Sequence, residues 1–286
     1  MKKENFQAGL TLLRKPVLPL VSMVLFLQQL SGPQSKVEDI ITEMPEPVET
    51  EYTVYARPRE LLRRYLDYFD LPEAAGSPRK TEIQVVDESG QPVDETTAHT
   101  ALISQRILEK ELEEINSRLC APCSCTLCCT GPESRMEQEF FEIPLQEQET
   151  ECFALACHDT ADSRSRSAMD DEAQPLQING APFYQSEAAR LIHWQNGWSM
   201  ILPKESSCPA LEHSGRCRIY SNRPLVCRRP QIFSYILAPT GQPDRYMLRN
   251  TLLAVTDCPY VRVLQEEIAA YAAACELNFV LKGNKR

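Results

Sequence analysis

The chain lacks the residues and motifs that mark the common catalytic and nucleotide-binding sites. It has only 10 glycines and 4 histidines among 286 residues, which disfavours a glycine-rich loop around a phosphate. It contains no G-x-G-x-x-G, G-x-x-x-x-G-K, G-x-S-x-G or H-E-x-x-H pattern. These patterns mark dinucleotide, nucleotide, hydrolase and zinc-protease sites, so none of these activities has support in the sequence.

An excess of positive charge is also missing. The chain has 30 basic and 40 acidic residues, giving a net charge of -10. A negative protein repels both nucleic acid and anionic membranes, so we expect no nucleic-acid partner. The length and the 43% apolar fraction suffice for a buried core that needs no disulfide bonds.

No apolar run is long enough to be read as a membrane span without ambiguity. Residues 17–30 are strongly apolar and follow basic residues, as in a signal sequence, but prolines and glutamines interrupt them and no A-x-A cleavage site follows. A spanning helix needs roughly 20 predominantly apolar residues. We therefore expect a helix that is buried or bound to a protein partner, without stable membrane insertion; targeting or membrane association is the alternative left open.

The pattern predicts an α+β protein with two regions. Residues 1–98 carry no chemical motif and are read as an N-terminal extension or accessory region, the candidate for binding a protein partner. Residues 99–286 are read as a cysteine-cluster metal-binding domain with flanking helices and a small antiparallel hairpin.

Apolar periodicity gives the expected elements of the second region. Leu108, Leu112, Ile115 and Leu119 recur at helical spacing, which predicts a helix from about Thr100 to Cys120 with its glutamates on the opposite side. We further expect strands at 140–145 and 198–202, a helix at 186–194, a hairpin of 231–237 with 246–255, and a last helix at 261–279 with Cys275 in the core.

Cysteine is what the chain has in excess. Nine of the twelve cysteines fall into two groups, and adjacent thiols and C-x-x-C spacings suit metal chelation in a reducing cytoplasm better than disulfide bonding. We therefore expect a cytoplasmic protein and a thiolate-bound metal. The candidate ligands are Cys120, Cys123, Cys125, Cys128 and Cys129 in the first group, and Cys208, Cys217, Cys227 and Cys258 in the second.

The spacings say more about geometry than about the identity of the metal. A C-x-x-C turn directs two sulfurs to one ion, whereas the adjacent pair Cys128 and Cys129 is expected to serve different centres or different irons. The second group has long gaps and must be assembled by the fold. Thiolates select zinc, copper(I) or iron–sulfur clusters, and the choice between zinc and an iron–sulfur cluster stays open. Reserve ligands are Cys152, Cys157, His158 and His213.

Five arginines lie among the thiols of the second group. Positive charge beside a thiol favours its thiolate form and offsets the charge of a multi-thiolate centre. The alternative is that these side chains form ordinary surface salt bridges. The residues are Arg216, Arg218, Arg223, Arg228 and Arg229.

The tract C-P-A-L-E-H-S-G-R-C-R-I-Y-S-N-R-P-L-V-C-R from Cys208, followed by Cys258-Pro259, resembles the CxxCxxCC cysteine-cluster family, the YkgJ-like zinc- or iron-chelating proteins. The resemblance covers roughly residues 119–259. Cys125, Cys128 and Cys129 fit its C-x-x-C-C portion, but the outermost family cysteine falls on Pro122, which leaves Cys120 and Cys123 as alternatives.

Three functions follow as hypotheses. The first is a metal-binding protein that holds zinc or an iron–sulfur cluster through both cysteine groups. The second is an iron–sulfur oxidoreductase or protein-modifying enzyme, a label that the resemblance brings without an identifiable substrate site or catalytic residue. The third is a structural zinc domain within a protein-interaction scaffold.

Overall fold

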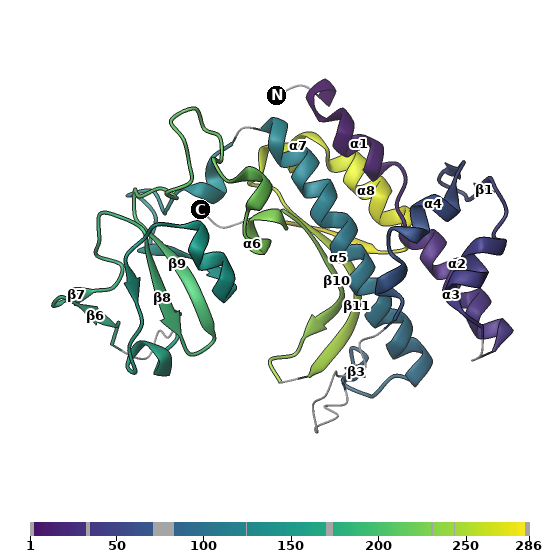
Figure 1. Cartoon of the computed structure of the whole chain (residues 1–286), viewed down its shortest axis with the longest axis horizontal. Coiled ribbons are helices and arrows are strands. Elements are labelled where there is room, and N and C mark those ends of the chain that lie inside the picture. Colours follow the sequence, from purple (N-terminus) through teal and green to yellow (C-terminus); the bar gives the residue numbers. More distant parts are fainter. Residues whose placement is uncertain are drawn as a thin grey trace. The chain divides into compact units, whose positions relative to one another are not determined.

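The protein forms two compact units, each a mixture of helices and small sheets. A computed structural model describes residues 3–32, 35–70, 83–123, 125–169, 174–229, 231–242 and 244–283. The first unit comprises Met1–Cys123 and Arg229–Asn284, and the second comprises Ser124–Arg228. Helices and sheets in both units confirm the predicted α+β class (Figure 1).

The first unit is built on the long helix α5, Glu95–Cys123. The four predicted core positions, Leu108, Leu112, Ile115 and Leu119, are all buried along one side of this helix, as an amphipathic pattern requires. The helix continues past Cys120 through Pro122 to its last residue, Cys123. The predicted helix is therefore confirmed and is longer at both ends.

Helix α5 lies beside the predicted hairpin, whose strands are β10, Ile232–Pro239, and β11, Arg245–Val255 (Figure 1). The two strands are antiparallel, and β11 also pairs in parallel with β12, Asn278–Lys282, and β3, Gln84–Val86. Asn116 of α5 accepts hydrogen bonds from the Gln231 and Ile232 amides at 3.0 and 3.2 Å. A buried side-chain amide thus satisfies backbone groups at the start of the sheet.

The end of the chain corrects the predicted last helix. Helix α7, Pro259–Val263, and helix α8, Gln265–Ala274, replace one continuous helix, and Phe279 lies in strand β12. Glu276 has φ of 57°, a left-handed conformation that ends helical structure. Cys275 is buried beside α8, as expected for a core residue.

The N-terminal apolar segment forms helices that are half-buried. After the short turn η1, Lys3–Phe6, helix α1, Gln7–Leu13, packs on α5, and helix α2, Leu18–Ser31, buries Leu20, Val21 and Val24. Phe26 and Leu30 stay exposed. The span Lys3–Ser31 is apolar and long enough to cross a membrane, a property shared by soluble core helices and signal sequences.

The acidic side of α5 differs from the prediction. Glu111, expected to face solvent, is 4% exposed; its carboxylate accepts hydrogen bonds from the Val17 amide at 2.9 Å and from the Tyr271 hydroxyl at 2.5 Å. Glu111 follows Leu108 by three positions and precedes Ile115 by four, so helical spacing places it on the apolar side. These two hydrogen bonds connect the α1–α2 junction and α8 to the long helix α5.

Residues 35–70 complete the N-terminal part of the first unit. They contain helix α3, Val37–Glu43, the pair of short strands β1, Val48–Glu49, and β2, Val54–Tyr55, helix α4, Pro58–Arg63, and the turn η2, Leu66–Tyr68. Helices α1 and α2 both contact α5. The functional division into residues 1–98 and 99–286 stays a prediction.

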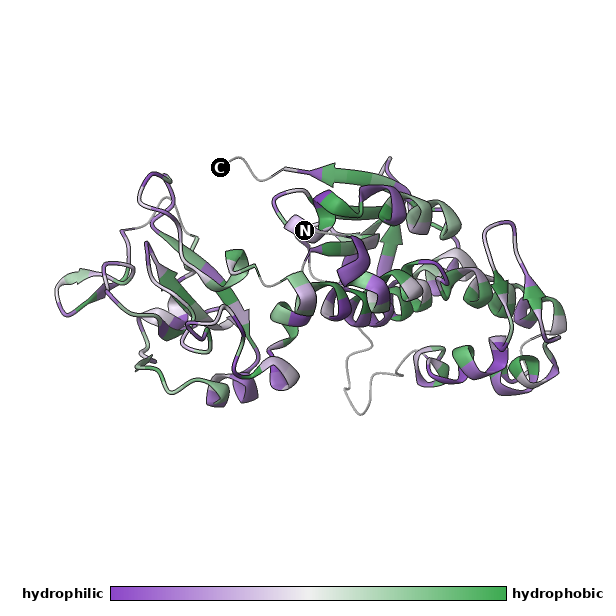
Figure 2. Cartoon of the chain, turned by 90° about the horizontal axis from the view of Figure 1, so that it is seen from above, coloured by the Kyte–Doolittle hydropathy of each residue, from purple (hydrophilic) through white to green (hydrophobic). Residues whose placement is uncertain are grey.

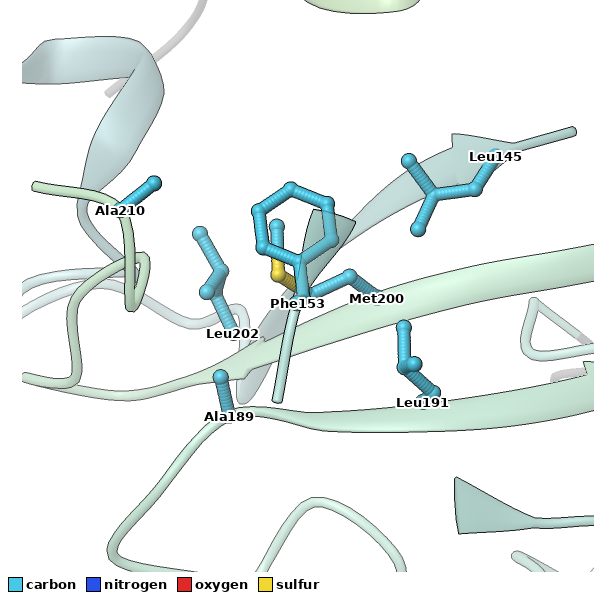
Figure 3. Close-up of a cluster of buried hydrophobic side chains, with 7 residues drawn as sticks. All are labelled: Leu145, Phe153, Ala189, Leu191, Met200, Leu202 and Ala210. Carbon is cyan, nitrogen blue, oxygen red and sulfur yellow. The ribbon is translucent and has the colours of Figure 1, made fainter. Parts of the chain in front are cut away.

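The second unit has a four-stranded sheet in the order β4-β9-β8-β5. The outer strand β4, Phe140–Leu145, confirms a predicted strand and pairs antiparallel with β9, Gly197–Pro203. Strand β9 also pairs antiparallel with β8, Arg190–Trp194. The short strand β5, Cys157–His158, pairs in parallel with β8 at the other edge of the sheet. Two apolar clusters are built on it. The first contains Leu145, Phe153, Ala189, Leu191, Met200, Leu202 and Ala210 (Figure 3); the second contains Leu176, Phe183, Ile192, Trp194 and Ile201.

Strand β8 corrects the helix predicted at 186–194. Leu191 belongs to the first cluster and Ile192 and Trp194 to the second, so both sides of the strand are buried. Such a strand reads as a continuous apolar run, which periodicity alone cannot separate from a helix. The Trp194↔Gly197 pairing closes a two-residue hairpin loop of Gln195 and Asn196, and Gly197 directly after it has φ of 117°, a conformation that favours glycine.

The remaining elements of the second unit are short. Figure 2 shows hydrophobic residues gathered along strands and helix faces, with hydrophilic residues common in the connecting loops. The short elements are η3, Leu127–Cys129, η4, Glu147–Cys152, η5, Ser163–Ser165, the hairpin of β6, Gln177–Ile178, with β7, Ala181–Pro182, η6, Tyr220–Asn222, and α6, Leu225–Arg228.

Candidate metal centre

Three cysteines meet where the chain leaves helix α5. The sulfurs of Cys123, Cys125 and Cys258 all lie within 4.8 Å of one another. We call these three residues the α5 thiol group. Two sulfurs bound tetrahedrally to one zinc ion at about 2.3 Å are about 3.8 Å apart, so small side-chain adjustments suffice for the three sulfurs to share an ion.

Helix ends position the α5 thiol group. Cys123 is the last residue of α5, Cys125 follows two residues later, and Cys258 is the N-cap of α7 with Pro259 as the first helical residue. Cys123 and Cys258 are buried. Cys120 precedes Cys123 by three helical positions and so lies on the same side of α5, which makes it the nearest further thiol on the helix itself.

A second set of thiols gathers within the second unit. The thiols of Cys128, Cys208, Cys217 and Cys227 lie near enough to Cys129 to raise its pKa. We call these five residues the loop thiol group. In the described part of the chain, no three of their sulfurs lie within 4.8 Å of one another, in contrast to the α5 thiol group. The fold therefore places cysteines of the first sequence group near three of the second, and a shared metal site among them stays a prediction.

Backbone hydrogen bonds join the first two segments of the loop thiol group. The amide of Cys208 donates to the carbonyl oxygen of Cys129 at 2.7 Å, and Thr130 and Ser207 form an antiparallel bridge beside it. The Gly131 amide then donates to Ser206 at 2.9 Å. A Cβ at Gly131 would lie 1.9 Å from the Pro203 carbonyl oxygen, so this close approach requires glycine.

A tight loop carries the chain from Cys208 to Cys217. The Leu211 amide donates to the Cys208 carbonyl at 2.9 Å, the Arg218 amide donates to Ala210 at 2.8 Å, and Leu211 and Cys217 form a bridge. Cys208 and Cys217 both pack at the margin of the apolar cluster of Figure 3, which includes Ala210. One end of the sheet core thus supports two thiols.

Arg223 fixes the backbone around Cys227. Its guanidinium donates to the carbonyl oxygens of Tyr220 at 3.0 Å and Cys227 at 3.2 Å, and it lies 3.8 Å above the centre of the Tyr220 ring. Arg223 is only 7% exposed. The Glu149 carboxylate accepts a hydrogen bond from the Leu225 amide at 2.7 Å. This bond satisfies an amide at the start of the four-residue helix α6 that has no partner within the helix.

Burial dominates the protonation of the loop thiols. It raises the pKa of Cys227 to about 12, with smaller increases from neighbouring thiolates and a decrease from Arg223. Burial raises the pKa of Cys129 further and that of Cys208 as well. Arg218 lowers the pKa of Cys208 and Arg223 lowers that of Cys227, which is the predicted direction, but burial outweighs both. Burial therefore favours the neutral thiol form of these side chains.

The other three cysteines lie outside both groups. Cys152 packs against the apolar cluster of Figure 3, Cys157 is exposed on β5, and Cys275 is buried beside α8. All twelve cysteines fall within the described residues, and none of them forms a disulfide bond. Among the described residues, neither His158 nor His213 joins a group of three ligand atoms within 4.8 Å of one another.

Sequence reasoning missed the division of the nine candidates into these two sets. It placed Cys125 beside Cys128 because of their C-x-x-C spacing, whereas Cys125 meets Cys123 and Cys258, and Cys128 interacts with Cys129 and Cys227. The C-x-x-C spacing does not reveal that Cys125 lies with Cys123 and Cys258 and not with Cys128, because this depends on the residue at which α5 ends. The assignment of Cys128 and Cys129 to different centres stays a prediction.

Comparison of the chain with protein-family models, with curated proteins and with solved structures finds no match.

Proposed function

We propose that this chain is a metal-binding protein that holds zinc or an iron–sulfur cluster through cysteine thiolates. The observation that carries the proposal is the α5 thiol group, in which three cysteine sulfurs lie within 4.8 Å of one another. Isolated buried cysteines act as small apolar side chains and have no reason to converge. Thiolate donors fit zinc and iron–sulfur centres and disfavour magnesium or calcium.

The ligand assignment follows the two thiol groups. Cys123, Cys125 and Cys258 supply three ligands at the end of α5, and Cys120 is the proposed fourth. Cys129, Cys208, Cys217 and Cys227 supply four ligands in the second unit, with Cys128 as the alternative. Each set reaches the four thiolates that a closed zinc site or an iron–sulfur cluster takes.

A resident metal of either kind supplies a distinct chemistry. Zinc closes a site and stabilises the surrounding loops without redox activity, whereas an iron–sulfur cluster carries electrons. Membership of the cysteine-cluster family is part of this proposal, supported by the tract from Cys208 to Arg228. A cytoplasmic location, which keeps twelve thiols reduced, belongs to it too.

Anaerobic purification of the full chain tests the proposal directly. The measurements are metal content by elemental analysis, acid-labile sulfide and the visible absorption spectrum. Stoichiometric zinc in a colourless protein supports the structural form, and iron with labile sulfide supports the redox form. Protein that contains neither metal, even after anaerobic reconstitution with zinc or with iron and sulfide, contradicts the proposal.

Single cysteine variants test the ligand assignment. Cys123→Ser and Cys227→Ser should each lower the bound metal, because serine is a poor ligand for soft metals. Cys275→Ser is the matched control: it also alters a buried thiol but lies outside both groups. Equal metal loss in all three variants would show that the loss follows general destabilisation and would contradict the assignment.

A further inference from the structure

The first unit also contains an open cavity that is separate from the thiols. Its volume is about 340 Å³, and it lies between the end of α1, the segment from β2 through α4, and the middle of α5. This volume falls within the range of small-molecule sites, roughly 300–1,000 Å³. We propose that this cavity binds a small organic monocarboxylate with an apolar body.

One tyrosine hydroxyl in the cavity is available to a ligand. Tyr65 is 4% exposed as a residue and lines the cavity. Its hydroxyl makes no hydrogen bond within the described part of the chain, and it is not one of the buried polar atoms that lack a partner. The neighbouring Tyr55 hydroxyl, by contrast, donates to the Pro16 carbonyl at 2.6 Å. The Tyr65 hydroxyl is therefore suited to exchange water for an oxygen of a bound molecule.

The charges around the cavity favour an anion. Arg57 is paired with Glu60 at 2.9 Å and Arg64 with Glu114 at 2.5 Å, which leaves Lys15 as the cavity-lining cation without an ion pair among the described residues. Leu12 and Leu61 supply apolar contact area. A single carboxylate near Lys15 and Tyr65, with a short hydrocarbon body, complements this lining.

Glu111, which also lines the cavity, does not oppose this assignment. Its two oxygens already accept from the Val17 amide and the Tyr271 hydroxyl. Burial raises the pKa of Glu111 to about 7, so a large share of the molecules carry this side chain as a neutral acid near neutral pH. The repulsion between Glu111 and a bound carboxylate weakens as pH falls through that range.

Calorimetric titration of the full chain with hexanoate tests the inference, with hexan-1-ol and hexylammonium as neutral and cationic probes of equal length. We expect hexanoate to bind more tightly than both. Tyr65→Phe should weaken hexanoate binding roughly ten- to a hundredfold, the effect of one hydrogen bond to a charged group. Lys15→Gln should weaken it about threefold and leave hexan-1-ol unaffected.

Matched controls make the result decisive. Tyr68→Phe and Lys36→Gln, which change the same residue types outside the cavity lining, should leave hexanoate affinity unchanged. Absence of hexanoate binding at millimolar concentration overturns the inference, as does equal affinity for hexylammonium or no effect of Tyr65→Phe in a folded variant. Cys227→Ser should keep hexanoate affinity, so this proposal and the metal proposal fail independently.

Discussion

The two units of this protein are stabilised in different ways. In the first unit, a helix of 29 residues buries a continuous apolar side, and Asn116 and Glu111 bind backbone and hydroxyl groups inside the core. In the second unit, the segments that carry thiols are a three-residue 3-10 turn, a four-residue helix and loops with isolated bridges. Short elements such as these bury little surface by themselves.

The difference teaches where a metal matters for stability. Removing the proposed metal from helix-rich packing leaves the apolar core intact. The loops that carry the loop thiol group are otherwise attached by a few backbone hydrogen bonds and by contact with one apolar cluster. Structural zinc in small domains contributes folding free energy of about 10 kcal/mol or more. We therefore expect these loops of the second unit to depend on the proposed metal more strongly than the first unit does.

Metal removal should have the largest effect and tests this comparison most severely. Chelation under reducing conditions should raise amide hydrogen exchange most in the segments around Cys217 and Cys227, and less around Cys129 and Cys208, which a backbone hydrogen bond joins without a metal. The middle of α5 and the β10–β11 hairpin should keep their protection, because neither depends on a thiol. Exchange followed by mass spectrometry measures both regions in one sample, and equal loss in the two would break the comparison.

The buried carboxyl of the first unit gives the next largest effect. Glu111 has a pKa raised from its usual 4.5 to about 7 because burial disfavours its charge. The folded state therefore holds the proton more tightly than the unfolded state, and stability is lost as pH rises through about 7. The full loss is about 3 kcal/mol, from roughly 1.4 kcal/mol per pKa unit.

Glu111→Gln isolates this contribution. The variant cannot ionise, so its free energy of unfolding should fall less between about pH 5 and about pH 8 than that of the parent chain. Denaturant titrations at the two values, followed through a probe in the first unit, measure the difference. Parallel pH dependence in the two proteins would show that the carboxyl stays ionised in the folded state.

A backbone contact in the second unit gives the smallest effect. Gly131→Ala introduces a Cβ that would lie 1.9 Å from the Pro203 carbonyl oxygen, and the backbone must shift to admit it. We expect a loss of about 1–3 kcal/mol, typical of overpacking, together with lower metal content. Thermal unfolding and metal analysis measure these quantities.

Gly283→Ala is the control for this substitution. Its Cβ would lie 3.5 Å from the Thr256 hydroxyl oxygen, an ordinary contact. The control should therefore keep both the unfolding temperature and the metal content. A Gly131→Ala protein that matches it in both would contradict the requirement for a close approach next to Cys129.

Several elements were predictable from their apolar residues, including the strand at 198–202, which became β9 and is buried on both sides. The helix through Leu108 and Leu119 and the strand at 140–145 were recognised from their apolar residues. The segment at 190–194 was misread because both sides of β8 are buried. The final helix was overextended because its apolar stripe continues past the left-handed Glu276 into β12.

The candidate site was predictable in membership but not in arrangement. The nine cysteines stood out by number and spacing, yet their division into two groups depends on how far α5 extends, which no C-x-x-C spacing records. Likewise, Glu111 was placed among solvent-facing glutamates, although its offset from Leu108 and Ile115 put it on the buried side. In both cases, three-dimensional packing decides between positions that local sequence leaves equivalent.

The hydrogen bond between the Cys208 amide and the Cys129 carbonyl also bears on the order of assembly. Bringing two distant parts of a chain together carries an entropic cost that grows slowly with the length of the loop. Here a backbone hydrogen bond holds the two cysteines side by side and needs no metal ion to do so. The proposed ion would therefore meet a pair of cysteines that are already close, and its binding energy would be left for drawing in Cys217 and Cys227.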